Sequence, residues 1–293
     1  MPVNHEYLQA SKDIIRGALL GLSAYIKPGG LHRLAPDRVY DEVACNLVSS
    51  IDFIILALEV GNNIRKGAES LVSIDLGKLL ADSTKEAFRA CGSAHPQYII
   101  PLVVGALCIG HSGVESIINE SSKFKRSLEL VSSIDKGSSI KRFISVLKTV
   151  NRSDMYDHLN SLGYTELSLM HSSVSFNDIY RGLGSRWRGF LIVESREAVL
   201  FTYLNRMVEL YKKHGSLSES AVALYMEIVK PHIPRSFAEL VQKVESCGYM
   251  ATPECSRLML ELDVNLRKNK YTYEWASEIV VLTSAFASFE GLK

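Results

Sequence analysis

The stretch "VYDEVACNLVSSIDFIILAL", from Val39 to Leu58, decides the fold class. Its apolar residues recur at three- and four-residue spacing, at Val39, Val43, Leu47, Ile51, Ile54, Ile55 and Leu58. That spacing places them on one face of an α-helix, whereas a half-buried strand would alternate apolar and polar residues. The stretch therefore predicts one long amphipathic helix over residues 38–60.

The same helical spacing extends over most of the chain. Thr252 followed by Pro253 is typical of a helix start, and Gly215 and Gly248 are typical of helix ends. The best strand candidate, "RGFLIVES", is short. We therefore predict a single all-α domain over residues 1–293, with about ten to twelve helices. The expected ranges are 4–24, 38–60, 74–91, 96–119, 138–149, 153–162, 175–189, 196–213, 217–230, 234–247, 252–269 and 271–289.

Two segments are expected to depart from regular helix. Pro101 lies one turn inside the helix expected over 96–119, so it should kink that helix or move its start later. The polar stretch "NESSKFKRSLELVSSIDKGSS", from Asn119 to Ser139, is rich in serine and lysine but contains no proline. We interpret it as a surface excursion near 119–139 inside one domain.

The composition narrows the classes of function. Lys and Arg number 33 and Asp and Glu number 32, so no bulk field attracts nucleic acid or an anionic membrane. The apolar run Tyr98–Gly110 is too short to span a bilayer, and the first residues lack the pattern of a signal peptide. Five cysteines without a C-x-x-C pair indicate reduced core thiols. A cytoplasmic protein without a membrane segment is expected, and a homo-oligomer is possible.

The loop "KPGGLHR", Lys27–Arg33, is the first candidate site. Lys27 and Arg33 carry charges that suit phosphate oxygens, and the amides of Gly29 and Gly30 can approach an anion closely because glycine has no Cβ. His32 adds a further donor. The loop could hold a phosphate in this way, or it could simply turn the chain between two helices.

Two further segments carry side chains that can act as an acid, a base or a metal ligand. His95, at a small-residue turn before a proline, could act as an acid or a base, or could cap the helix that follows. Asp154 and Asp157 share a helix face and could bind a magnesium–phosphate unit, or could complement the helix dipole.

Arginines flank an aromatic residue in the segment "YRGLGSRWRGF". Around Trp187, the three arginines Arg181, Arg186 and Arg188 could stack on a base or bind phosphates, or could form a surface cluster beside a buried indole. Several enzyme classes lack their motifs in this chain: D-D-x-x-D, H-E-x-x-H, G-x-S-x-G and G-x-G-x-x-G do not occur.

The segment "GALLGLSAYIKPGGLHR", followed by the helix "YDEVACNLVSSIDFI", resembles the opening of the triphosphoribosyl-dephospho-CoA synthase family. Lys27, Pro28, Gly29, His32 and Arg33 match the family's loop, the last two as in its archaeal-type branch. The turn "SAHPQYIIPLVVGAL" and the end "YEWASEIVVLTSAFASFEGL" resemble later parts of the family pattern, and His95 matches its histidine. Strong identity is confined to about ten residues near the start.

The resemblance implies an all-helical enzyme that joins ATP to 3′-dephospho-CoA. The 2′-hydroxyl of the acceptor ribose attacks C1′ of ATP and adenine leaves. The resemblance places Lys27, Gly29, Gly30, His32 and Arg33 on the phosphates and His95 in the same pocket as the catalytic residue. Asp52 or Asp154 would hold a magnesium ion.

The chain departs from the family pattern at several positions. Gly21 stands where the family has a glutamate, and Ser93 and Ala94 replace its asparagine and threonine. The late acidic motifs are absent around "VKPHIPRSF" and "NKYTYEWAS". Two hypotheses follow: a nucleotide-dependent transferase, or a helical protein that binds a nucleotide or CoA derivative without turnover.

Overall fold

The computed structural model describes residues 5–35, 38–134, 137–165, 167–171, 173–197 and 199–293. These residues are all-α, as predicted, and contain no strand. The helix count lies slightly above the ten to twelve expected. The α-helices are α1 (His5–Ser23), α2 (Val39–Ser49), α3 (Ile51–Arg65), α4 (Leu76–Cys91), α5 (Pro96–Ser112), α6 (Ser121–Ser132), α7 (Gly137–Thr149), α8 (Ser153–Ser161), α9 (Ser168–His171), α10 (Phe176–Gly184), α11 (Val199–His214), α12 (Leu217–Val229), α13 (Ala238–Cys247), α14 (Pro253–Lys268) and α15 (Glu274–Phe289).

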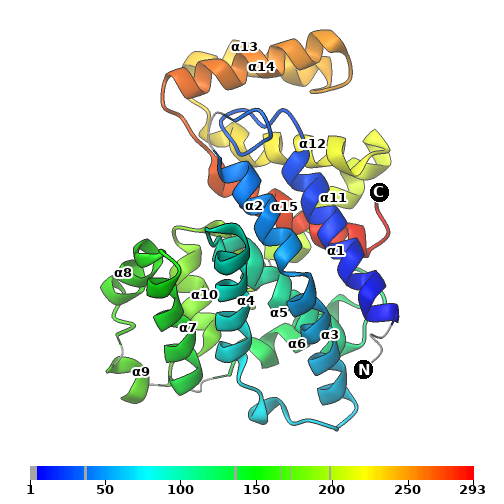
Figure 1. Cartoon of the computed structure of the whole chain (residues 1–293). Helices are drawn as coiled ribbons and strands as arrows, with labels where there is room; N and C mark the ends of the chain where they lie inside the picture. The colour runs from blue at the N-terminus through cyan, green and yellow to red at the C-terminus, as the bar shows by residue number, and fades with distance from the viewer. Residues whose placement is uncertain (1–4, 36–37, 135–136, 166, 172, 198) are drawn as a thin grey trace.

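The helices α5 and α15 form the centre of the molecule. Every residue of α5 from Pro96 to Gly110 is buried, which accounts for the apolar run seen in the sequence. Pro101 lies inside α5 without ending it. Helix α3 packs on α5 and α1 packs on α15. In Figure 1 the pair α13 and α14 lies at one end of the molecule and α9 at the other.

Small residues let α1 and α15 approach closely. A Cβ at Gly17 would lie 2.2 Å from the backbone oxygen of Ser284, and one at Gly21 would lie 2.6 Å from the Ser284 hydroxyl. Ser288 fills the space beside Gly17. We call this contact of Gly17 and Gly21 with Ser284 and Ser288 the α1–α15 seam.

The helix expected over 38–60 is interrupted at Ser50. The Ser50 hydroxyl donates to the carbonyl of Leu47 at 2.7 Å, a local bond that competes with the helical ladder. The chain bends there by 41° between α2 and α3. No single helix in the described part of the chain has the length and apolar character to cross a membrane, although this bent pair passes that test together.

The expected surface excursion near 119–139 was wrong for most of its length. Ser121–Ser132 is helix α6, and it buries Phe124, Leu128 and Val131, spaced four and three residues apart. Asp135 and Lys136 lie outside the described residues. The segment "RGFLIVES" forms no strand, in agreement with the all-α prediction, and Arg188–Ile192 is a 3-10 helix.

The expectation of reduced thiols was wrong for four of the five cysteines. Cys45 on α2 is bonded to Cys91 at the end of α4, and Cys247 is bonded to Cys255. Cys108 is buried and free. Spacing along the chain did not reveal the first pair, because its members are 46 residues apart and are brought together only by the packing of α2 on α4.

Candidate functional site

Lys27 is fully buried beneath the loop between α1 and α2. Its Nζ donates to the carbonyl oxygens of Gly21 at 2.6 Å and Leu22 at 3.0 Å. These carbonyls belong to the last turn of α1, whose oxygens have no partner within the helix. Burial lowers the pKa of Lys27 to about 7. The lysine therefore caps α1.

The glycine amides of the loop face protein acceptors. The amide of Gly29, whose φ is 71°, donates to Asp263 Oδ1 at 2.7 Å, and the amide of Leu31 donates to Ser277 Oγ at 2.8 Å. A Cβ at Gly30 would lie 2.5 Å from Tyr225 Oη. The glycines thus allow close packing of the loop on α12, α14 and α15.

His32 and Arg33 point in different directions. His32 is buried, with Nε2 3.4 Å from Asp263 Oδ2. Arg267 Nε donates to the same carboxylate at 2.9 Å. Arg33 is exposed and lies over the ring of Tyr25, 4.8 Å from its centre. Of the five residues predicted to bind phosphate, only Arg33 reaches the surface.

Asp263 joins the loop to α14, and its removal should destabilise the protein. Burial alone would raise the pKa of Asp263, but bonds from His32 and the Gly29 amide and the charge of Arg267 hold it below the usual value. Breaking such a group leaves buried donors unpaired, so Asp263→Ala should lower the free energy of unfolding by about 3 kcal/mol. Urea unfolding at neutral pH measures this loss.

The pH dependence of the unfolding free energy identifies the contribution of Asp263 to stability. Its pKa is depressed in the folded state, so its stabilisation is present above the unfolded pKa and is lost as the pH falls through the folded value. The difference in unfolding free energy between wild type and Asp263→Ala should therefore become smaller in acid. Glu261→Ala, exposed on the same helix, serves as control. Equal losses in both variants would contradict this role.

His95 sits at the start of α5 and faces a carboxylate on α2. Its backbone amide donates to Asn46 Oδ1 at 2.7 Å, and its Nε2 lies 3.0 Å from Glu42 Oε2. The imidazole makes no side-chain bond to the helix start. Its side chain is 14% exposed. Burial lowers the pKa of His95, and the bond to Glu42 opposes that change.

Arg152 links Asp154 to the turn that holds His95, because its Nη1 donates to the carbonyl oxygen of Ala94 at 3.3 Å. The guanidinium of Arg152 bonds to both carboxylate oxygens of Asp154 at 2.9 Å, and to Gln97 Oε1 at 3.0 Å. The charges of Arg152 and Asp154 both act on the pKa of His95. Two residues predicted from the sequence, His95 and Asp154, thus share one cluster with Glu42 and Arg152, which we call the His95 cluster.

The sequence did not single out Glu42 and Arg152. Asp157 is exposed on α8. A further missed residue is Glu278 on α15, which is buried and accepts a bond from the Gly189 amide at 2.8 Å. Burial raises the pKa of Glu278 to about 8.

Trp187 is enclosed by its neighbours. The guanidinium carbons of Arg186 and Arg152 lie 5.0 Å and 5.7 Å from its ring centre, and His158 meets it edge-on at 5.6 Å. The indole is 8% exposed. These contacts agree with the interpretation of a buried indole beside surface arginines.

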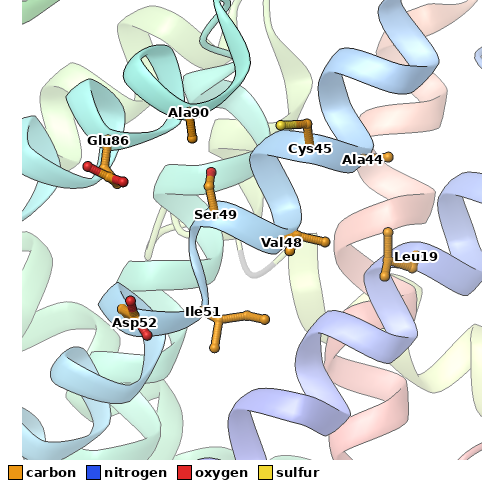
Figure 2. A pocket seen from close by; sticks show the side chains of 9 residues that line it. All are labelled: Leu19, Ala44, Cys45, Val48, Ser49, Ile51, Asp52, Glu86 and Ala90. Atoms are coloured by element: carbon orange, nitrogen blue, oxygen red, sulfur yellow. The ribbon is translucent and has the colours of Figure 1, made fainter.

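Asp52 lies apart from the other candidates. It is exposed on α3, where it lines a hollow of about 680 Å³ together with Glu86 of α4 (Figure 2). Within the described ranges no three His, Cys, Asp or Glu side chains gather as metal ligands would. The structure therefore places the predicted site residues in three locations: the packed loop, the His95 cluster and the hollow beside Asp52.

Comparison with known proteins gives no relative for this chain: no family model, no curated protein and no solved structure matches it.

Proposed function

We propose that the chain is a nucleotide-dependent transferase resembling triphosphoribosyl-dephospho-CoA synthase, with the His95 cluster as its acid–base centre. The observation that supports this is the pairing of His95 Nε2 with Glu42 Oε2 at 3.0 Å, next to Arg152 and Asp154. A histidine oriented by a carboxylate is the arrangement that general acid–base catalysis needs. The substrates proposed are ATP and 3′-dephospho-CoA.

In this proposal the His95 imidazole carries the hydroxyl proton of the acceptor to the departing adenine. With Nε2–H donating to Glu42, the lone pair of Nδ1 is the basic atom of the His95 ring. The 2′-hydroxyl oxygen of the acceptor forms a bond to C1′ of ATP while the bond from C1′ to adenine breaks. The hydroxyl proton passes to Nδ1 and then to the departing adenine, so the histidine is regenerated.

The cations have separate roles in this proposal. Arg33 is the loop residue that contacts the triphosphate, while Lys27, Gly29, Gly30 and His32 hold the loop in place. A magnesium ion would enter with ATP. Asp154, whose two carboxylate oxygens bond to Arg152, does not fit as its protein ligand, and Asp52 is not part of the cluster. No step is therefore assigned to a bound metal.

Replacing the histidine should abolish most of the activity. We expect wild type with ATP, magnesium and 3′-dephospho-CoA to release adenine, measured by mass spectrometry together with the triphosphoribosyl product. His95→Gln should lower the rate by about 10²- to 10⁴-fold, the range of general acid–base catalysis. His111→Gln, in which the lost imidazole contacts Ser127 elsewhere, should keep the wild-type rate. Unchanged turnover in His95→Gln, or no adenine from wild type, would contradict the proposal.

Removing the carboxylate should shift the pH profile. Glu42 raises the pKa of His95 against the effect of burial, so Glu42→Gln should lower that pKa further. A general base must be deprotonated, and the acid limb of the rate profile should therefore move to lower pH. The pH dependence of adenine release in both proteins measures this shift. A shift to higher pH would exclude Glu42 as the partner of the base.

The alternative is a protein that binds a nucleotide or CoA derivative without turnover. The observation that favours it is that Asp154, a carboxylate expected to hold magnesium, is paired with Arg152, while the loop cation Arg33 stays exposed. Calorimetric titration with ATP and CoA distinguishes the two functions. Binding that weakens in Arg33→Ala, without adenine release, would support the binding protein.

A further inference from the structure

The disulfide between Cys45 and Cys91 joins the two segments that hold the His95 cluster together. Cys45 is in the middle of α2, three residues after Glu42 and on the same face of that helix. Cys91 is the last residue of α4, and His95 follows it four residues later. The covalent bond therefore connects the helix that carries the carboxylate to the turn that carries the imidazole.

Asn46 of α2 makes the hydrogen bonds that accompany this disulfide. Its Nδ2 donates to the carbonyl oxygen of Ser93 at 3.0 Å, and its Oδ1 accepts from the His95 amide at 2.7 Å. Asn46 directly follows Cys45 in the chain, so the covalent bond and both hydrogen bonds act on the same short turn. A displacement of Cys45 relative to Cys91 therefore moves the side chain that positions His95.

Opening the disulfide changes the distance between these two segments. Bonded sulfur atoms are closer together than two thiol sulfurs can approach, so reduction separates Cys45 from Cys91. Nε2 of His95 lies 3.0 Å from Oε2 of Glu42 in the bonded form. A displacement of about 1 Å takes these two atoms beyond hydrogen-bond distance. The state of the disulfide thus decides whether the pair can form.

A reductant can reach this bond from the surface. Cys45 and Cys91 are both half-buried, and Cys45 lines the open hollow of about 680 Å³. Figure 2 shows its sulfur directed from α2 toward the part of α4 that carries Ala90. In the second disulfide Cys255 is buried, and its partner is only 8 residues away in the chain. The first disulfide is therefore the one that is open to exchange and that also links distant elements of the fold.

We infer that the Cys45–Cys91 disulfide is a redox modification site, exchanged by a dithiol reductant, that controls the pairing of His95 with Glu42. The oxidised protein holds the pair, and the reduced protein separates it. Control of adenine release by this bond rests on the proposed function, whereas control of the pair itself does not.

The exchange conserves atoms and electrons. A thiolate of the dithiol attacks Cys45 Sγ, forms a mixed disulfide and expels Cys91 as a thiolate. The second thiol of the reductant then attacks the mixed disulfide and expels Cys45. The protein gains two electrons and two protons as two thiols, and the reductant leaves as a disulfide. A disulfide oxidant reverses both steps.

Nuclear magnetic resonance titration of His95 in the full-length protein tests the inference without any substrate. The charges that act on its pKa come from Glu42 on α2 and from Arg152 and Asp154 at the start of α8. The change in the His95 pKa that Glu42→Gln causes therefore measures the pair itself. We expect this change to fall to less than half of its oxidised value after reduction with dithiothreitol. An equal change in both states, with the disulfide shown open by peptide mapping, would overturn the inference.

Serine variants identify which disulfide acts. Cys45→Ser with Cys91→Ser cannot form the bond, so its titration should resemble that of the reduced protein and should not respond to dithiothreitol. Cys247→Ser with Cys255→Ser keeps the first disulfide and should respond as wild type does. Circular dichroism checks that each variant is folded. A response that persists without Cys45 and Cys91, or a bond between them that dithiothreitol does not open, would also overturn the inference.

Adenine release separates this inference from the proposed function. Reduction should lower the rate of adenine release by wild type at least about tenfold, because a misplacement of about 1 Å can cost about 100-fold, and reoxidation should restore it. An unchanged rate in the reduced protein would contradict the control of catalysis. If neither state releases adenine, the proposed function fails, and the His95 titration still decides the inference.

Discussion

A Gly17→Val variant is expected to lose about 3 to 5 kcal/mol of unfolding free energy, because a side chain there enters the α1–α15 seam. The first added carbon would lie 2.2 Å from the backbone oxygen of Ser284 and 2.4 Å from Ser288 Cβ. A backbone atom cannot rotate away as a flexible side chain can, so the two helices must separate. The apolar face between them then loses its contacts.

Chemical denaturation of Gly17→Val and of a matched variant measures this effect. Lys12→Val places the same β-branched side chain on the exposed side of α1, where it does not meet α15. Gly17→Val itself carries no helix-propensity cost, because glycine is a poorer helix former than valine. Lys12→Val should lose less than about 1 kcal/mol. Similar losses at positions 12 and 17 would mean that the seam tolerates a wider spacing.

The unfolding free energy of a Lys27→Met variant should differ from that of wild type by an amount that changes strongly with pH. The pKa of Lys27 falls from 10.5 to about 7 on folding, so the unfolded chain holds more protons between these values. Stability rises with pH wherever the unfolded state binds more protons. From pH 7 to 10 the unfolding free energy of wild type should therefore increase by on the order of 4 kcal/mol relative to that of the methionine variant.

Unfolding free energies of wild type and Lys27→Met across this range measure the difference. Below pH 7 the lysine is charged in both states and the difference should be constant. Lys12→Met, on the exposed side of α1, should show no such dependence. If the difference in unfolding free energy stays constant between pH 7 and 10, Lys27 is not shielded from water in the folded protein.

Most of the fold follows from helical spacing. The all-α class and the positions of α1, α4, α5, α12 and α15 were predicted because apolar spacing extends along each of them. The apolar spacing continues through Ser50, so the break there was not predicted from the sequence. Helix α6 was missed because its few apolar residues stand among serines and charges, although Phe124, Leu128 and Val131 keep helical spacing.

Local sequence did not reveal the long-range partners of the candidate site residues. The sequence identified the donors of the loop, but it did not show that Asp263, 234 residues away, already accepts the Gly29 amide. It identified His95 and Asp154, whose residue types suggest chemistry, and missed Glu42, which acquires a role only because α2 packs beside the start of α5. Pairing across the fold is a property of the packed chain, and a single sequence does not record it.

The α1–α15 seam also sets an order of events during synthesis. Gly17 leaves the ribosome 267 residues before Ser284, an interval of roughly 15 to 50 s at ordinary rates of translation. Throughout that time the close-packing face of the first helix has no partner, and the loop that follows it lacks Asp263 and Ser277 as well. The nascent chain therefore exposes this face of α1 until α15 emerges. A chaperone that covers apolar nascent segments has its longest opportunity on α1.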